Sequence, residues 1–279
     1  MFSVNTAILS FLIGIVGTIF GGTQTFIMTG FAGIFIFGLK AAGVESAFLT
    51  DTLLNTVFLP AIIFNAASVA SAYASRKHDI EGWDVNHSLL FTHDPLVSLM
   101  GGVGGLIGYL VFAFAQAINL PADQGSFSVI LVGILTRLVF GHGHWMNPNA
   151  TAYYKKEGPK YWAFQAINAV GICGLTAVVL SYVDPGFYTI VFNISAALIL
   201  LSGFDAMRRT YPTTHHETLV VAYAMAATGG NVVVSALFGI LANLIYLLFA
   251  RYFNENCDTH IDPPAVAIEI CSLILFTLF

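Results

Sequence analysis

Apolar runs long enough to cross a lipid bilayer follow one another along almost the whole chain, with short polar loops between them. A spanning helix needs about 20 predominantly apolar residues. Only 9% of the 279 residues are charged, whereas a soluble domain carries about 25%. A soluble core of this size could not enclose so much apolar sequence. The chain is therefore predicted to be an all-α, polytopic membrane protein with a single transmembrane domain over residues 1–279.

The polar loops divide the chain into apolar regions that predict about eight transmembrane helices. These regions are Ala7–Leu39, Ala47–Ser75, Asp94–Ala117, Ser126–Phe140, Trp162–Val183, Gly186–Phe204, Glu217–Ala250 and Pro263–Phe279. The first and seventh regions are too long for one straight span, and they contain the glycine pairs Gly21-Gly22 and Gly229-Gly230. Paired glycines permit a break inside a span, so both regions are interpreted as glycine-interrupted helices.

The distribution of charge predicts an orientation for this eight-span arrangement. The loops near residues 76–93, 141–161 and 205–216 fall on one side and hold most of the Lys and Arg. Loops rich in Lys and Arg face the cytoplasm, which predicts a multi-pass protein of the inner or plasma membrane with both termini in the cytoplasm. The opposite face is then acidic and attracts cations; it collects Glu45, Asp123, Asp184, Glu255, Asp258 and Asp262.

Two stretches of the chain, at residues 63–94 and 191–217, show the same order of features. Each contains a Phe-Asn pair, then a basic pair, then a Thr-His motif ahead of an acid. Parallel and inverted internal repeats are both common among transporters. The shared order suggests two four-helix halves in parallel orientation, over residues 1–145 and 146–279, while chance matches in apolar sequence are the alternative.

Three Asp-Pro pairs mark predicted helix starts: Asp94-Pro95, Asp184-Pro185 and Asp262-Pro263. An aspartate at the N-cap accepts hydrogen bonds from free N–H groups of the first turn, and proline suits the first helical position. Capping is the preferred interpretation for Asp94 and Asp184. Asp262 has neighbours that the other two lack, which makes it a candidate for function as well.

The segment around Asp262 is the strongest candidate for an ion or substrate site. Asp258, His260 and Asp262 alternate in one loop, and Glu269 follows seven residues later on the same predicted helix face, about 10 Å deeper. Carboxylates inside a span usually face the protein interior or a water-filled cavity. Glu269 is therefore predicted to carry a proton or an ion, with Asp258 and Asp262 as outer ligands; the alternative is a shallow helix that lets Glu269 reach headgroup water.

Other candidate binding residues lie on the second region and at the two glycine breaks. Asp51 and Asn55 are one helical turn apart, and Asn231 follows Gly230. Interrupted helices expose backbone groups that transporters use to bind substrates and ions, which makes Gly22 and Gly230 candidates too. The alternative is structural, with hydrogen bonds between helices and close packing of glycines. Packing is the preferred interpretation for Gly101–Gly108, where glycines recur at four-residue spacing.

Histidines and cysteines give weaker signals. Seven of the eight histidines fall on the predicted cytoplasmic side, but no pair has the spacing of a helical zinc motif. They are interpreted as solvated loop residues. The three cysteines form no CxxC motif, so neither a disulfide framework nor a zinc-thiolate site is predicted. Nothing in the charge pattern indicates a nucleic-acid partner.

The pattern as a whole is typical of a membrane transporter or channel for a small ion or polar solute, with proton or cation coupling as one option. Its partners would be the lipid bilayer and that solute, and sets of spans this small often assemble as homo-oligomers. Two other classes are consistent with the sequence. One is an intramembrane metal-dependent enzyme that uses the histidines with Asp and Glu on the cytoplasmic side, and the other is a non-transporting scaffold subunit.

Overall fold

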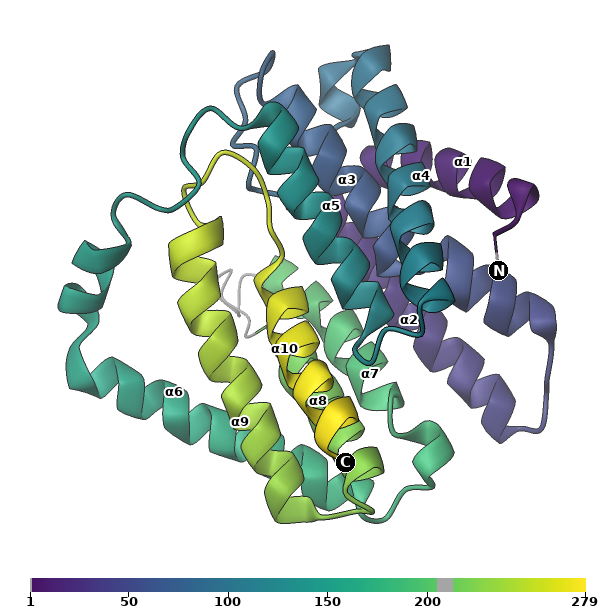
Figure 1. Cartoon of the computed structure of the whole chain (residues 1–279), viewed down its shortest axis with the longest axis vertical. Helices are drawn as coiled ribbons and strands as arrows, with labels where there is room; N and C mark the ends of the chain where they lie inside the picture. The colour runs from purple at the N-terminus through teal and green to yellow at the C-terminus, as the bar shows by residue number, and fades with distance from the viewer. Residues whose placement is uncertain (1, 205–212) are drawn as a thin grey trace.

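The computed structural model describes residues 2–204 and 213–279, and for residues 151–157 it describes the backbone alone. Within these residues the chain is helical, with no strand, and its ten α-helices pack together (Figure 1). The helices are α1 (Val4–Phe20), α2 (Gly22–Ala41), α3 (Pro60–Ala74), α4 (Pro95–Ala117), α5 (Gln124–Phe140), α6 (Ala150–Leu180), α7 (Ile190–Leu198), α8 (His215–Ala227), α9 (Val232–Phe249) and α10 (Pro263–Leu278). Shorter 3-10 or π-helical segments adjoin some of them: η1 (Phe48–Val57), η2 (Leu90–Thr92), η3 (Pro185–Phe187), η4 (Ile199–Gly203) and η6 (Ala250–Asn254).

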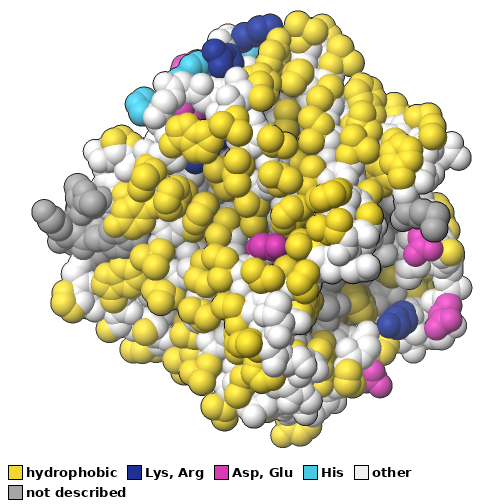
Figure 2. Space-filling view, viewed as in Figure 1, with side chains coloured by type: hydrophobic (Ala, Val, Ile, Leu, Met, Phe, Trp, Pro, Cys, Tyr) yellow, Lys and Arg dark blue, Asp and Glu magenta, His cyan; other side chains and the backbone are white. Residues whose placement is uncertain are grey.

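The surface has the character of a membrane protein. Within the described ranges, six helical segments are long and apolar enough to cross a bilayer, and α1, α5 and α10 are apolar but shorter. Many large apolar side chains point outward, and Figure 2 shows them spread over the face while Lys, Arg and His gather at its rim. An exposed apolar surface of this extent marks contact with lipid or with partners. The helical, multi-pass membrane class is thus supported, whereas a count of eight spans is not.

The three predicted Asp-Pro helix starts are confirmed. Asp94 accepts a hydrogen bond from the N–H of Leu96 at 2.8 Å, Asp184 from Gly186 at 2.8 Å, and Asp262 from Ala265 at 2.9 Å. Asp184 begins the 3-10 turn η3 ahead of α7, and the other two begin α4 and α10. Capping therefore fixes where these elements start.

Both glycine pairs separate two helices. Gly21 has a φ of +96° between α1 and α2, and a Cβ there would lie 2.5 Å from the backbone oxygen of His87. Gly229 and Gly230 have φ values of +63° and +88° and form the turn between α8 and α9. Glycine adopts positive φ without steric cost. Each over-long apolar region thus contributes two helices, which accounts for the difference from the eight predicted.

The predicted close packing of Gly101–Gly108 is confirmed. A Cβ on Gly101 would lie 1.7 Å from Oγ1 of Thr18 in α1, and one on Gly105 would lie 2.5 Å from the carbonyl oxygen of Ser10. Farther along α4, a Cβ on Gly108 would lie 1.9 Å from the carbonyl oxygen of Ala61 in α3. Small residues let helix backbones approach closely in membranes, so α4 is held tightly against both neighbours.

Two short helices, α3 and α8, lie at the centre of two similar groups. Most residues of α3 are buried, as are most of α8. α3 packs against α1, α2, α4 and α5, and α8 packs against α6, α7, α9 and α10. Each element of the first group thus has a counterpart in the second, in the same chain order.

The two groups meet through counterpart helices that run antiparallel. In α2 and α7, Gly30 lies against Ala197 while Lys40, at the other end of α2, donates a hydrogen bond to the carbonyl oxygen of Gly186 at 3.1 Å. In α5 and α10, the N–H of Asp123 donates to Oγ of Ser272 at 2.8 Å, and Gly133 lies against the backbone of His260. The parallel orientation expected from the sequence is not the one in the structure.

The loop at residues 255–262 lies elsewhere than the sequence placed it. The eight-span count put Glu255, Asp258 and Asp262 on the face opposite the histidine-bearing loops. In the structure Asp258 accepts a hydrogen bond from the N–H of His144 at 2.9 Å, and the ring of His260 bonds the carbonyl oxygen of Trp83. This loop therefore shares one end of the bundle with residues 76–93 and 141–149. The cause is the extra reversal at Gly229-Gly230, which moves the loop at residues 255–262 to the side of the two earlier loops.

Candidate functional site

A cavity of about 370 Å³ lies where the two groups of helices meet. Its wall is built from α2, η1, the junction between η1 and α3, α4 and α5 of the first group, and from α7, α8 and α10 of the second. The N-terminal ends of α3, α5, α8 and α10 all reach it, through Pro60, Gln124, His215 and Asp262. Pockets that bind small molecules have volumes of about 300–1,000 Å³, so this one can hold a small solute.

Two aspartates from different groups line the cavity, and each begins a helix. Oδ1 of Asp123 accepts the N–H of Ser126 at 2.6 Å, and its Oδ2 accepts the hydroxyl of Tyr223 from α8. Oδ2 of Asp262 accepts the N–H of Ala265, and its Oδ1 lies 3.2 Å from Nε2 of His260. A carboxylate has about four lone-pair sites. Both aspartates therefore hold their helix caps and keep capacity for a ligand.

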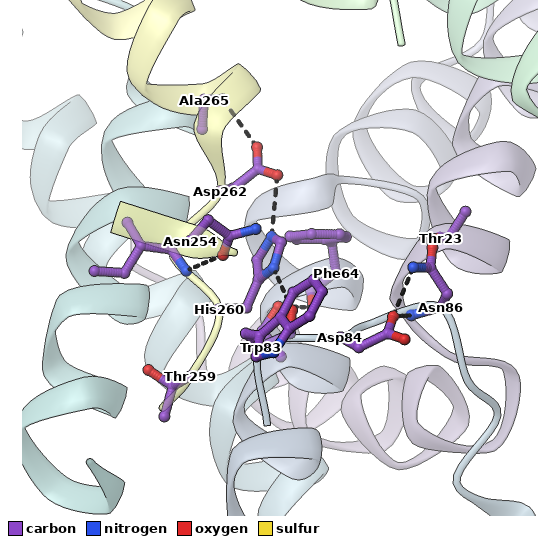
Figure 3. A network of polar contacts seen from close by, with 12 residues as sticks. Thr23, Phe64, Trp83, Asp84, Asn86, Asn254, Thr259, His260, Asp262 and Ala265 are labelled. Carbon is purple, nitrogen blue, oxygen red and sulfur yellow. Dashed lines mark hydrogen bonds and ion pairs between the residues drawn. The ribbon is translucent and has the colours of Figure 1, made fainter. Parts of the chain in front are cut away.

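His260 and Asp262 lie side by side, with Nε2 of the ring directed at the carboxyl group (Figure 3). Nδ1 of His260 lies 2.9 Å from the carbonyl oxygen of Trp83, which can only accept, so Nδ1 carries a hydrogen. Nε2 then faces the Asp262 carboxyl. That second hydrogen bond needs one more proton, either on Nε2 or on the carboxyl. The ring is 8% exposed and packs edge-on against Phe64 at 5.5 Å, which keeps the pair in this orientation.

His215, the first residue of α8, lines the same cavity. Its side chain is 6% exposed and packs between the rings of Phe26 in α2 and Phe192 in α7, at centroid distances of 4.4 Å and 5.9 Å. Its Nδ1 is buried and has no hydrogen-bond partner among the described residues. A buried polar atom without a partner carries a free-energy cost, and a bound solute or a water in the cavity would relieve it.

A buried arginine ties together the loops at the end of the bundle beside His260. Arg137 is 1% exposed; its guanidinium donates to the carbonyl oxygen of Phe253 at 2.7 Å and to that of Trp145 at 3.0 Å, and it also reaches both oxygens of Thr259. The planar fork of an arginine suits several fixed acceptors at once. The arginine thus joins the end of α5 to residues 141–149 and 253–259.

Asp258 strengthens the same junction. Burial raises the pKa of Asp258, but the backbone N–H groups of His142 and His144 donate to its carboxylate and the His144 ring lies 3.3 Å away, so the pKa falls below its ordinary value. The carboxylate is therefore charged at neutral pH and holds the loop at 141–149 against the loop before α10. Asp258 does not line the cavity. It holds the two loops together beside the cavity.

The structure brings together part of the predicted site. Asn55 and Asp262 line one cavity, and His260 bonds Asp262 directly. Asp51 is exposed on η1. Asn231 is exposed and caps α9 through the N–H of Val234 at 3.1 Å.

Both predicted glycines lie away from the cavity wall. Gly22 is the first residue of α2 and lies against Val85 and Phe64, and Gly230 lies in the turn before α9. Any role of either glycine in binding stays a prediction.

Glu269 lies two turns along α10 from Asp262 and does not line the cavity. Its side chain is partly exposed, and its Oε2 is buried without a hydrogen-bond partner among the described residues. Asp123 is a charged group close enough to interact with it. The role of Glu269 as a proton carrier stays a prediction.

Three titratable residues of the cavity wall were missed by the sequence interpretation: Asp123, His215 and Tyr223. Asp123 precedes an apolar run as Asp94 and Asp262 do, but it lacks their proline. His215 was assigned to a solvated loop, yet it and His216 are buried at the start of α8. A signal was present, because Thr214 and Glu217 have the spacing of a capping box ahead of an apolar run. Nothing in the sequence distinguished Tyr223.

The remaining histidines do not converge. His78 lies 3.7 Å from Asp94 and His87 lies 3.0 Å from Asp84, at separate places on the surface. Within residues 2–204 and 213–279, apart from the side chains of 151–157, no group of three or more His, Cys, Asp or Glu could hold a metal ion. The three cysteines, Cys173, Cys257 and Cys271, lie within the described ranges, and each is free and buried.

Comparison with known proteins relates the chain to one family. No curated protein matches it, and no solved structure does. One family model matches residues 1–151 and 155–279, which is nearly the full length. The gap between the matched segments falls at the start of α6, where the second group of helices begins. The chain therefore belongs to the family described as "Family of unknown function (DUF7973)".

Proposed function

We propose that this protein is a secondary transporter that moves a small solute through the cavity between its two groups of helices. One observation carries the proposal: counterpart helices from the two groups run antiparallel, and the cavity lies where they meet. Transporters built from inverted repeats place their substrate site at the interface of the repeats, near the middle of the membrane, and often at helix N-termini. A scaffold subunit needs neither the cavity nor the paired helix ends.

The two groups are proposed to be five-helix halves of inverted orientation, divided as the sequence suggested, near residues 145 and 146. An odd number of crossings in the first half makes the second half start from the other side of the membrane. The pairs α2 with α7 and α5 with α10 then relate the halves about an axis in the membrane plane. Rocking of one half against the other would open the cavity to each side in turn.

The positive charges support a definite orientation for this arrangement. Described Lys and Arg residues lie at the end of the bundle that holds residues 76–93, 141–149 and 255–262: Arg76, Lys77, Arg137, Lys160 and Arg251. Lys40 lies at the other end, beside Gly186. The positive-inside rule then puts the first end in the cytoplasm. Because α1 runs toward that end and α10 runs away from it, both termini are proposed to lie outside the cytoplasm.

A reporter fused to the C-terminus tests the orientation. We expect alkaline phosphatase, which folds only outside the cytoplasm, to be active there, and a green fluorescent protein fusion to be dark. The same reporters placed after residue 81, in the loop between α3 and α4, should give the opposite result. Fluorescence of the fusions at both positions would put the C-terminus and residue 81 on the same side, which would restore the eight-span orientation and remove the inverted arrangement.

Coupling is proposed to reside in His260 and Asp262. Asp262 faces the cavity while His260 faces the loops that close the proposed cytoplasmic end, and the pair is proposed to share one proton when the solute is absent. His215 from α8 and Tyr246 from α9 are further titratable groups near Asp262. Loss of the proton leaves a net negative charge at the cavity, which links proton movement to the occupancy of the site.

Access to the cavity tests transport without knowledge of the solute. In Asn55→Cys, we expect a membrane-impermeant maleimide to label the cysteine from either side of sealed vesicles, because alternating access exposes the cavity to both. The native cysteines are buried, so the unmodified protein supplies the background. A matched control is Ala66→Cys, which places the thiol at a fully buried position of α3 away from the cavity. Labelling from one side only, under all solute and pH conditions, would exclude transport.

A further inference from the structure

The charges around the cavity are unbalanced toward negative. Two carboxylates line it, Asp123 and Asp262, while no Lys or Arg is found among the lining residues that the structure describes. Asp262 has the ring of His260 beside it, but Asp123 has only hydroxyl and backbone donors. Hydrogen bonds stabilise a carboxylate without cancelling its charge. A solute that brings a positive charge would complete the site.

Aromatic rings make up much of the remaining wall. They come from both halves: Phe26, Phe37, Phe58, Phe112, Phe192 and Tyr223. The face of an aromatic ring attracts cations, and cages of such rings bind quaternary ammonium groups. A hydrated metal ion would instead require several oxygen or nitrogen ligands at short distance. The wall thus favours an organic cation with apolar substituents over an inorganic ion.

His215 is an independent sign that the cavity is built for a ligand. Its ring is more than nine-tenths buried between two of these phenylalanines, and Nδ1 has no partner in the described structure. A neutral imidazole can accept a hydrogen bond at one nitrogen and donate at the other. A hydroxyl or ammonium N–H of the solute would satisfy this atom.

We propose that the cavity binds a small organic ammonium cation, with its charge beside Asp123 and its apolar substituents among the aromatic rings. This inference rests on the proposed transport function and names its substrate class. The His260–Asp262 pair is net neutral when it shares a proton and net negative when the proton has left. Release of the proton would therefore attract the cation, so the exchange of cation for proton follows from the arrangement.

Three molecules of nearly the same shape and different charge test the inference. They are choline, its uncharged isostere 3,3-dimethylbutan-1-ol, and the anion 3,3-dimethylbutanoate, each titrated calorimetrically into the purified protein in detergent. We expect choline to bind at least about tenfold more tightly than either of the other two. Equal binding of the alcohol, tighter binding of the anion, or no binding of choline would overturn the inference.

Asp123→Asn shows whether the charge lies where we place it. Asparagine caps a helix as well as aspartate does, so α5 should keep its start. We expect choline affinity to fall by about tenfold, the effect of one lost charge interaction, and the weak binding of the alcohol to stay the same. Asp184→Asn is the matched control, because Asp184 caps η3 at an exposed position away from the cavity. Unchanged choline affinity in Asp123→Asn would overturn the assignment.

The two proposals fail separately. Binding in detergent needs no transport, so labelling of Asn55→Cys from one side only, with choline binding intact, would refute transport and keep the cation site. Labelling from both sides without choline binding would keep transport and refute the cation site.

Discussion

Replacing Asp262 with asparagine is expected to abolish uptake driven by a pH gradient. Asparagine still accepts the N–H of Ala265, so α10 keeps its cap, but it cannot take up and release the proton that the carboxyl shares with His260. Asp123 is untouched by the change. The variant should therefore still bind choline while a proton gradient no longer drives the solute across the membrane.

Proteoliposomes with an imposed pH gradient measure this effect as uptake of radiolabelled choline. We expect the Asp262→Asn variant to fall to the level of empty liposomes and Asp184→Asn to match the unmodified protein. A second readout does not depend on the solute: labelling of Asn55→Cys should vary with pH, and this variation should disappear when Asp262→Asn is added. Full gradient-driven uptake by Asp262→Asn would rule out the pair as the coupling site and leave Glu269 as the candidate proton carrier.

Arg137→Met is expected to cause the largest loss of stability. Methionine fills much of the same volume but leaves the carbonyl oxygens of Trp145, Phe253 and Thr259 without their donor. Buried acceptors that lose a charged partner are costly, and the free energy of unfolding should fall by roughly 3 kcal/mol or more. Thermal unfolding of the purified protein in detergent gives the comparison.

Arg76→Met supplies the matched control for the arginine change. Arg76 lies at the same end of the bundle but is exposed, and it donates a hydrogen bond to the carbonyl oxygen of Phe140 at 3.1 Å. Its replacement should change stability by no more than about 0.5 kcal/mol. Arg137→Lys should recover only part of the loss, because an ammonium group lacks the planar fork that reaches separated acceptors. Equal stability of Arg137→Met and Arg76→Met would contradict the role of Arg137 in holding these loops together.

Some residues of the candidate site can be predicted from sequence patterns, and others cannot. Asp262, His260 and Asn55 were found because polar groups inside apolar sequence are unusual and their spacing is informative. Asp123, His215 and Tyr223 belong to the same cavity although they are far apart in the sequence. Asp123 and Tyr223 are 100 residues apart. No local rule links such residues, since their proximity arises from the pairing of α5 with α10 and of α2 with α7.

The sequence alone determined the properties that depend on near neighbours. Apolar composition determined the membrane class, Asp-Pro pairs determined where three helical elements begin, and the glycines of α4 determined which faces pack closely, because solvation, capping and steric contact act over a few residues. Tertiary structure decided the rest. The glycine turns at Gly21 and Gly229-Gly230 have the same local signature as a kink, and only long-range packing shows that the chain reverses there. Those reversals set the side of each later loop, the antiparallel pairing of the counterpart helices, and the cavity that forms between them.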